Sequence, residues 1–157
     1  MRIPVSYYLA RTERMPPAHF QRMANHESGL LGVSGISADV RDLLALEAKN
    51  VQAAEAVALF CYQAKKWIGS FAAALGGVDT LVFAAGIGEH APLIRQRICD
   101  GLGFLGIELD SKRNVKSAAL ISPGAGPVKV RVIHADEALM IARSVIHVLN
   151  IGASRNR

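Results

Sequence analysis

The stretch "DTLVFAAGIGEHAPLIRQRI", residues 79–98, limits the possible folds more than any other part of this sequence. An apolar run at 80–84 predicts a strand, Gly86 and Gly88 follow as a turn, and a segment with helical spacing of its apolar residues begins at Pro92. Because glycine lacks Cβ, we expect the turn to adopt positive φ angles and to let a ligand approach closely. The helix that follows directs free N–H groups towards the turn, which suits an anion. The order strand, glycine turn, helix therefore predicts an α/β protein with a phosphate-binding turn.

The part of the chain before this turn is predicted to be helical. Its expected elements are two short helical stretches within residues 1–27, an irregular loop at 27–37, a helix with Ser37 as its N-cap, and a long, largely buried helix at 51–75. The loop is expected because "ESGLLGVSGIS" carries three closely spaced glycines. Ser37 is expected as the cap because a hydroxyl can accept a hydrogen bond from a free N–H of the first turn.

The part after the turn is predicted to add a helix, two strands and a last helix. The helix runs from Pro92 to about Leu102, with Arg95 on its solvent side. The strands are "IELD" at 107–110 and "VKVRVIH" at 128–134, the second of which alternates apolar and polar residues. The last helix begins after Asp136, which is expected to cap it.

Composition excludes several classes of function. The net charge is +5, but the basic residues are scattered, and aromatic residues make up only 6% of the chain, so we expect no nucleic-acid binding. No uninterrupted apolar segment is long enough to span a membrane, and no signal peptide is recognisable. Cys61 and Cys99 are expected to be reduced, buried thiols of a cytoplasmic protein. Hydrophobic residues make up 51% of the chain, which indicates an apolar surface for a partner.

Two alternatives for the glycine turn stay open at this point. "GIGEHA" fits the dinucleotide pattern G-x-G-x-x-G/A, and Glu108 lies about twenty residues past Gly88, where a ribose-binding carboxylate is expected. Against an NAD-binding domain, too little chain follows residue 106 to form the second half of such a fold. The other alternative is a tight turn that binds no ligand.

Three stretches together resemble one family. They are "ESGLLGVSGISADVRDLL", "LVFAAGIGEHAPLIRQRICDGLGFLGIELD" and "VIHADEALMIAR", and in this order they are similar to the carboxyl-terminal part of acetate kinases. The resemblance runs from about Ile3 to Leu149. It implies a phosphotransferase that converts ATP and acetate to ADP and acetyl phosphate. It also implies a partial ribonuclease-H-like lobe, of the actin-like ATPase and sugar-kinase-like class, that lacks its leading strands.

The resemblance also implies a domain organisation and partners. Residues 1–157 are expected to form a single nucleotide-binding lobe, with a poorly defined helical lead-in at 1–27 and a basic tail at 151–157. The expected partners are an adenine nucleotide, a short-chain carboxylate or acyl phosphate, and a second copy of the chain in a homodimer. Neither nucleic acid nor a membrane is expected as a partner.

Site residues follow from the matched motifs. The "ADVRD" motif implies contact with the adenosine end of ATP or ADP by Asp39, Val40 and Arg41. The "GIGEH" motif implies contact with adenine, ribose and inner phosphates by Gly86, Ile87, Gly88, Glu89 and His90. In "HADEALMIA", Glu137 is the expected Mg²⁺-associated carboxylate. His90 and Asp136 stand where asparagine is usual in the family, and an imidazole offers a different donor and acceptor geometry from an amide.

No catalytic residue is assigned, because the family's groups around the migrating phosphoryl precede the matched part. His19, His26, His134 and His147 match no catalytic position and are expected to be structural or on the surface. We therefore expect turnover only when a separate amino-terminal half supplies those groups. The alternative is a non-catalytic remnant, or an ADP-binding, dimerising module.

Overall fold

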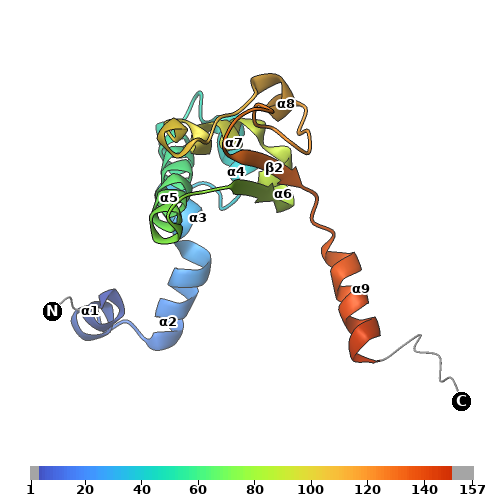
Figure 1. Cartoon of the computed structure of the whole chain (residues 1–157). Coiled ribbons are helices and arrows are strands. Elements are labelled where there is room, and N and C mark those ends of the chain that lie inside the picture. The colour runs from blue at the N-terminus through green and yellow to red at the C-terminus, as the bar shows by residue number, and fades with distance from the viewer. Residues whose placement is uncertain (1–3, 150–157) are drawn as a thin grey trace, which may run out of the picture. The chain divides into compact units, whose positions relative to one another are not determined.

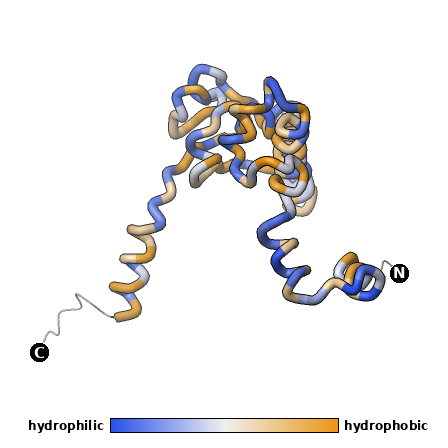
Figure 2. Tube along the Cα trace, turned by 180° about the vertical axis from the view of Figure 1, so that it is seen from behind, coloured by the Kyte–Doolittle hydropathy of each residue, from blue (hydrophilic) through white to orange (hydrophobic). Residues whose placement is uncertain are grey.

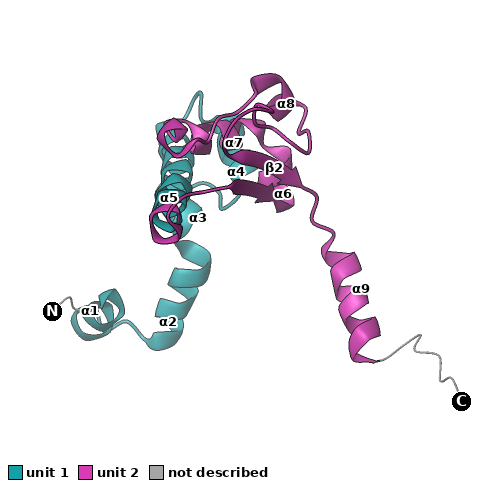
Figure 3. Ribbon diagram, in the orientation of Figure 1, with its two compact units in different colours: residues 1–71 teal, residues 72–157 magenta. Residues whose placement is uncertain are grey.

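The computed structural model describes residues 4–149 of the chain. These residues form helices and one small parallel sheet, so the α/β class predicted from the sequence is confirmed. The chain divides into two compact units, Met1–Phe71 and Ala72–Arg157, which Figure 3 shows in different colours. The predicted basic tail at 151–157 lies outside the described residues.

Within its described part, the first unit contains helices and their connections but no strand. Its elements are α1 (Val5–Thr12), α2 (Pro17–Arg22), the π-helical turn η1 (Met23–Glu27), α3 (Gly29–Ser34), α4 (Val40–Leu46) and most of α5 (Val51–Leu75). Figure 1 labels the five α-helices. The two short helical stretches expected near the start of the chain are confirmed as α1 and α2. Proline at the start of α2 is tolerated because the first N–H groups of a helix have no intrahelical acceptor.

The predicted irregular loop at 27–37 is wrong, because α3 occupies part of it. Two of its three glycines lie at the ends of the helix: Gly29 begins α3 and Gly35 ends it, each with a positive φ, of 64° and 65°. Only Gly32 lies in the helix interior. Glycines at the ends of a helix terminate it rather than prevent it.

The predicted N-cap of the next helix is also wrong. Asp39 caps α4, and its side chain accepts a hydrogen bond from the Arg41 N–H at 2.8 Å. The Ser37 hydroxyl instead accepts from the Asp39 N–H at 3.0 Å and donates to the Asp42 carboxylate at 2.7 Å. Both residue types suit a cap, and here the serine braces the turn that leads into the helix.

The long helix α5 has the predicted bounds, but it is not largely buried. Its buried residues are Ala53, Ala56, Val57, Cys61 and Ala72. Tyr62, Trp67 and Phe71 are exposed by 56–60%, and the rings of Trp67 and Phe71 stack with centroids 5.9 Å apart. The helix therefore buries one face only, as an amphipathic helix does.

The second unit holds the sheet. Its elements are β1 (Thr80–Ala84), α6 (Ala85–His90), α7 (Pro92–Cys99), the 3₁₀ turn η2 (Gly103–Leu105), α8 (Ser111–Val115), β2 (Lys129–Ile133) and α9 (Glu137–Val148). Strands β1 and β2 lie side by side in parallel, with a register that runs from Thr80 opposite Lys129 to Ala84 opposite Ile133 (Figure 1). Parallel strands need a long crossover, and α6 to α8 form it.

The strand predicted at 107–110 is not formed. This segment leads into α8, and the Asp110 side chain caps that helix by accepting from the Arg113 N–H at 3.0 Å. The neighbour of β2 on its second side is instead the segment around Leu120, which forms an antiparallel bridge with Arg131. Within residues 4–149, no strand pairs with the outer edge of β1, so its backbone groups are open to another strand.

Burial differs sharply between elements of the second unit. Its buried apolar residues include Ile94, Ile98, Ile107, Ile121 and Val130, each at most 5% exposed. None of the residues of α9 is buried, although Figure 2 shows apolar residues along this helix. Among the described helices, none combines the length and apolar character needed to cross a membrane.

Candidate functional site

The glycine segment after β1 is itself helical. Residues Ala85–His90 form α6, and neither Gly86 nor Gly88 has a positive φ. The positive φ expected at these glycines occurs one residue earlier, at Ala85, with a φ of 58°. A left-handed alanine is strained by roughly 1–2 kcal/mol. The chain thus turns sharply at Ala85 and enters α6 directly at the carboxyl end of β1.

The two glycines have different roles in the structure. A Cβ at Gly88 would lie 3.2 Å from the backbone carbonyl carbon of Phe83, which is closer than carbon atoms normally pack. A Cβ at Gly86 would meet no atom within 4 Å. Gly88 is therefore required by the packing of α6 on β1, whereas Gly86 leaves an open, exposed stretch of backbone.

The Glu89 side chain faces the protein rather than solvent. It is 8% exposed, and its two oxygens accept from the Ala135 N–H at 2.9 Å and pair with His134 Nδ1 at 2.6 Å. These hydrogen bonds, of which the one from Ala135 contributes most, lower the pKa of Glu89. The same contact raises the pKa of the exposed His134 imidazole. Glu89 thus connects α6 with the segment between β2 and α9.

Arg95 fixes the same helix from the inside. It is fully buried, and the desolvation of its guanidinium lowers its pKa. Each of its five N–H donors has a neutral acceptor at 2.7–3.0 Å: the carbonyl oxygens of Gly88, Glu89 and Asn114, the Asn114 side-chain oxygen and the Ser117 hydroxyl. The prediction that Arg95 lies on the solvent side of its helix is therefore wrong.

Sequence reasoning missed this network because its members are polar and far apart in the chain. Asn114 is buried as well, and its side-chain amide donates to the Pro92 carbonyl oxygen at 2.9 Å. One signal was present: Arg95 lies between Ile94 and Ile98 on α7, next to the apolar stripe. The helix that contains it, α7, is also shorter than predicted and ends at Cys99. Cys99 and Cys61 are both buried thiols, as expected.

The start of α9 follows the second strand, from which residues 134–136 separate it, whereas α6 follows the first strand directly. Asp136 caps α9, as predicted, by accepting from the Leu139 N–H at 2.9 Å. Glu137 is the next residue, and it is exposed. Among residues 4–149, no three acidic, histidine or cysteine side chains gather to hold a metal ion by themselves. One exposed carboxylate fits Mg²⁺, because this ion is usually held by one or two carboxylates together with substrate phosphates and water.

Asp39 and Arg41 lie in the first unit. The Arg41 guanidinium donates hydrogen bonds to the Asp39 carboxylate, from Nε at 3.0 and 3.1 Å and from Nη2 at 2.5 Å. This hydrogen bonding lowers the pKa of Asp39 to about 2 and raises that of Arg41. The Arg41 side chain is 84% exposed, so its outer face is accessible to a ligand. Val40, between them, is a buried residue of α4, so its side chain is not accessible to a ligand.

The predicted site residues therefore fall into two groups. The first group lies after the two paired strands of the second unit. It comprises Gly86, Ile87, Gly88, Glu89 and His90, which follow β1, and Glu137, which follows β2. The other comprises Asp39, Val40 and Arg41 in the first unit. His90 is exposed, and Ile87 is half-buried.

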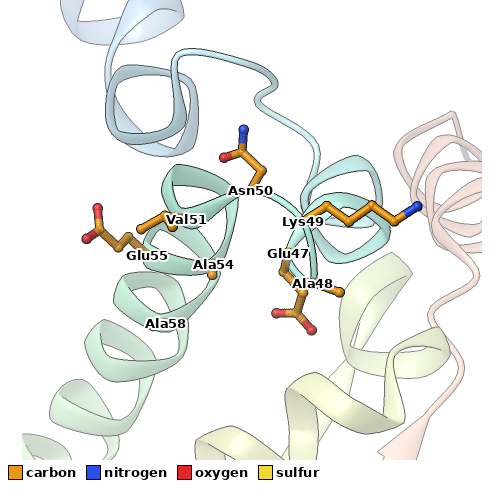
Figure 4. A pocket seen from close by; sticks show the side chains of 8 residues that line it. All are labelled: Glu47, Ala48, Lys49, Asn50, Val51, Ala54, Glu55 and Ala58. Carbon is orange, nitrogen blue, oxygen red and sulfur yellow. The ribbon is translucent and has the colours of Figure 1, made fainter.

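A surface hollow occurs where α4 leads into α5. It has a volume of about 460 Å³ and is lined by Glu47, Ala48, Lys49, Asn50, Val51, Ala54, Glu55 and Ala58 (Figure 4). None of the predicted site residues lines it. Asn50 serves a structural purpose there, since its side-chain oxygen accepts from the Ala53 N–H at 2.9 Å in the first turn of α5.

Comparisons with known proteins agree with the sequence motifs. The model of the Acetokinase family matches residues 3–143. The chain is 46% identical over 144 residues to the acetate kinase of Dictyoglomus thermophilum, a match that covers 90% of the chain and 36% of the relative. It is 42% identical over 142 residues to the propionate kinase of Yersinia enterocolitica, covering 90% of the chain and 34% of that protein.

Solved structures give the same result. The crystal structure of Porphyromonas gingivalis acetate kinase matches with a TM-score of 0.84 and 36% identity, over 95% of this chain and 39% of that one. A propionate kinase from Francisella tularensis matches with a TM-score of 0.81 and 31% identity, over 91% of this chain and 37% of that one. The chain thus spans about a third of the length of the curated relatives. It belongs to the acetokinase family.

Proposed function

We propose that this chain is the nucleotide-binding part of an acetate-kinase-type phosphotransferase and that it binds ADP and ATP with Mg²⁺. The observation that carries the proposal is the arrangement at the sheet. Two parallel strands end side by side, and each is followed by a predicted site segment: α6 comes directly after β1, and Glu137 comes after β2 and the short connection 134–136. Ligands of open parallel sheets bind outside the carboxyl ends of the strands.

The exposed parts of these segments provide the groups that a nucleotide needs. The backbone at Gly86 is open to close approach, since no atom lies within 4 Å of the position that a Cβ would take. Arg41 belongs to the first unit and is proposed as a nucleotide contact from its family motif alone; its exposed guanidinium can stack on a base or pair with an anion. Glu137 would hold Mg²⁺ together with the phosphates, and the ion when bound supplies positive charge at the phosphate oxygens.

The reaction proposed for the complete site is transfer of the γ-phosphoryl group to a short-chain carboxylate. A carboxylate oxygen attacks the γ-phosphorus, the bond from that phosphorus to the bridging oxygen breaks, and ADP and an acyl phosphate result. Such transfer requires cationic groups around the migrating phosphoryl group. We assign none of the predicted site residues to that task. The chain is therefore proposed to hold the nucleotide while another polypeptide segment completes the catalytic set.

Calorimetric titration of the chain with Mg-ADP tests the nucleotide site. We expect saturable binding, and we expect Arg41→Met to weaken it about tenfold, the effect of losing one or two charge-assisted hydrogen bonds. Arg22→Met is the matched control, since Arg22 is also an exposed arginine of the first unit paired with a carboxylate, that of Glu27, at 2.7 Å. Folded protein that takes up no Mg-ADP would overturn the proposal, and tighter binding of NADH would favour the dinucleotide alternative.

Mixing the chain with the remaining part of the Dictyoglomus thermophilum relative tests the reaction. We expect the mixture to form acetyl phosphate from ATP and acetate, and to do so only when both parts are present. Arg22→Met should support turnover at the original rate. If both parts fold and bind each other, yet form no acyl phosphate, the chain is a nucleotide-binding module without a role in transfer.

A further inference from the structure

The Glu89 carboxylate belongs to the motif expected to contact the nucleotide, but its surroundings exclude that role. The side chain is 8% exposed, and both of its oxygens already have partners within the second unit. Its charge would also repel the phosphates of ADP. A buried carboxylate that accepts hydrogen bonds from a neighbouring segment is suited to hold that segment in place.

Glu89 is well placed to act as such a holding group, because its own backbone is fixed. Its carbonyl oxygen accepts from Arg95 Nη1 at 2.9 Å and from the Ser117 hydroxyl at 3.0 Å. Arg95 is fully buried and Ser117 is half-buried. The side chain of Glu89 therefore extends from a rigid base.

The segment that Glu89 holds is the start of α9. Its carboxylate accepts from the Ala135 N–H at 2.9 Å, and Ala135 precedes Asp136, the N-cap of α9. None of the residues of α9 is buried, so side-chain packing contributes little to the position of this helix. The hydrogen bonds that His134 and Ala135 make with Glu89 therefore fix the connection between β2 and α9.

We propose that Glu89 is a positioning residue: its carboxylate ties the start of α9 to α6 and so sets where Glu137 stands relative to the nucleotide. This inference rests on the proposed nucleotide site. According to this proposal, the "GIGEH" motif at 86–90 has two separate tasks. The open backbone at Gly86 faces the ligand, and Glu89 holds the metal-associated carboxylate in register with it.

The test compares Glu89→Gln with Asp100→Asn by calorimetry. Asp100 is an exposed carboxylate at the end of α7, so its substitution makes the same change of charge without touching the connection. We expect Glu89→Gln to weaken Mg-ADP binding about tenfold, as loss of groups that orient metal ligands does, and to leave the binding of ADP in the presence of EDTA unchanged within about twofold. Asp100→Asn should change neither.

A double-mutant cycle with Glu137→Gln separates positioning from a general effect on the fold. If Glu89 acts through Glu137, then Glu89→Gln should weaken Mg-ADP binding no further once Glu137→Gln is present. Faster amide hydrogen exchange at Ala135 in Glu89→Gln provides a second readout that needs no nucleotide. If Glu89→Gln does not fold, His134→Ala, a change at an exposed side chain that removes one of the two contacts, should show a smaller loss of the same kind.

Three results would overturn the inference. They are equal weakening of ADP and Mg-ADP binding, additive effects of the two substitutions, and unchanged exchange at Ala135. In all three cases the wild-type chain still binds Mg-ADP, so the proposed function stands. Absence of any binding by the folded wild-type chain would overturn the proposed function and this inference together.

Discussion

The two helices that follow the paired strands, α6 and α9, are held in opposite ways. The fully buried Arg95 and the half-buried Ser117 donate hydrogen bonds to the carbonyl oxygens of Gly88 and Glu89 in α6. By contrast, α9 exposes all of its residues and depends on its connection to β2. One side of the candidate site is therefore preorganised by burial, whereas the other is placed by a few hydrogen bonds. Substitutions on the two sides should differ greatly in their effect on stability.

The largest effect is expected at Arg95. Arg95→Met removes five hydrogen bonds. The Gly88 carbonyl oxygen, the Asn114 side-chain oxygen and the Ser117 hydroxyl lose their donor, whereas the carbonyl oxygens of Glu89 and Asn114 each keep a hydrogen bond from Ser117. We expect Arg95→Met to lower the free energy of unfolding by about 3–5 kcal/mol, because each buried acceptor left without a donor costs about 1–3 kcal/mol. Urea denaturation followed by circular dichroism measures this loss. The matched control is Arg143→Met, because Arg143 is exposed on α9 and should change stability by less than about 0.5 kcal/mol.

Equal effects of the two arginine substitutions would contradict the comparison between the helices. Arg95→Lys sharpens it further. Lysine keeps the charge but offers three donors from a single nitrogen, so it cannot reproduce the planar set of contacts. We therefore expect it to restore only part of the stability lost in Arg95→Met.

A smaller effect is expected at the glycines of α6. Gly88→Ala places a Cβ 3.2 Å from the Phe83 backbone and should lower the free energy of unfolding by about 1–3 kcal/mol. Gly86→Ala meets no neighbour within 4 Å, and alanine favours a helix by up to about 1 kcal/mol, so it should leave stability equal or higher. Thermal unfolding measures both.

The Gly86→Ala and Gly88→Ala variants also allow an effect on nucleotide binding to be distinguished from an effect on stability. Gly86→Ala is expected to weaken Mg-ADP binding despite its stable fold, because the added methyl group covers backbone that the nucleotide approaches. A Gly86→Ala chain that binds Mg-ADP as the wild type does would show that the ligand does not approach this residue.

How much of this could be predicted from the sequence depends on the range of the interactions involved. Strands β1 and β2 and the bounds of α5 follow from local apolar patterns, and they were predicted correctly. The cap at Asp39 was not predicted, because Ser37, two positions earlier, is an equally suitable cap residue. The helix at 29–34 was not predicted either, because its closely spaced glycines indicate a loop, whereas Gly29 and Gly35 mark its ends. The acetokinase motifs identified the family through short stretches of matching residues.

The tasks of Glu89 and Arg95 could not be predicted, since their partners lie far along the chain. Glu89 meets residues more than forty positions away, and Arg95 meets Asn114 and Ser117 across a turn of irregular backbone. Arg95 was predicted to lie on the solvent side of its helix, because it lies outside the apolar stripe and charged residues are rarely buried. The contact of Glu89 with His134 and Ala135 follows only from the pairing of β1 with β2, which local sequence patterns do not give.

A pH-dependent effect of moderate size is expected at the contact between Glu89 and His134. The pKa of Glu89 is lowered, so its contribution is present above its ordinary value of 4.5 and is lost as the pH falls through the lower value. The pKa of His134 is raised, so its contribution is present below 6.5 and is lost as the pH rises through the higher value. The contact should therefore be strongest between about pH 4.5 and 6.5.

Amide hydrogen exchange at Ala135 measures how often the hydrogen bond from the Ala135 N–H to the Glu89 carboxylate opens. After correction for the intrinsic pH dependence of exchange, protection in the wild type should decline by less than about fivefold as the pH rises past the raised pKa of His134, as for a surface ion pair. In His134→Gln, which keeps a hydrogen-bond donor but does not titrate, the decline should disappear. Asp136 is the other charged group that acts on His134, so Asp136→Asn should retain the decline. A pH profile that His134→Gln leaves unaltered would show that the imidazole does not contribute to holding α9.

The smallest effect is expected from apolar residues of α9. Ile141 is 65% exposed, and glutamine favours a helix slightly more than isoleucine does, so Ile141→Gln should change the free energy of unfolding by less than about 0.5 kcal/mol. Ile94→Ala provides the contrast, since Ile94 is 1% exposed in the core and its truncation should lower stability by about 2–5 kcal/mol. A loss above about 1 kcal/mol in Ile141→Gln would mean that α9 packs its apolar residues against a surface. In that event burial, rather than the carboxylate of Glu89, would set the position of Glu137, and the two helices would no longer differ in how they are held.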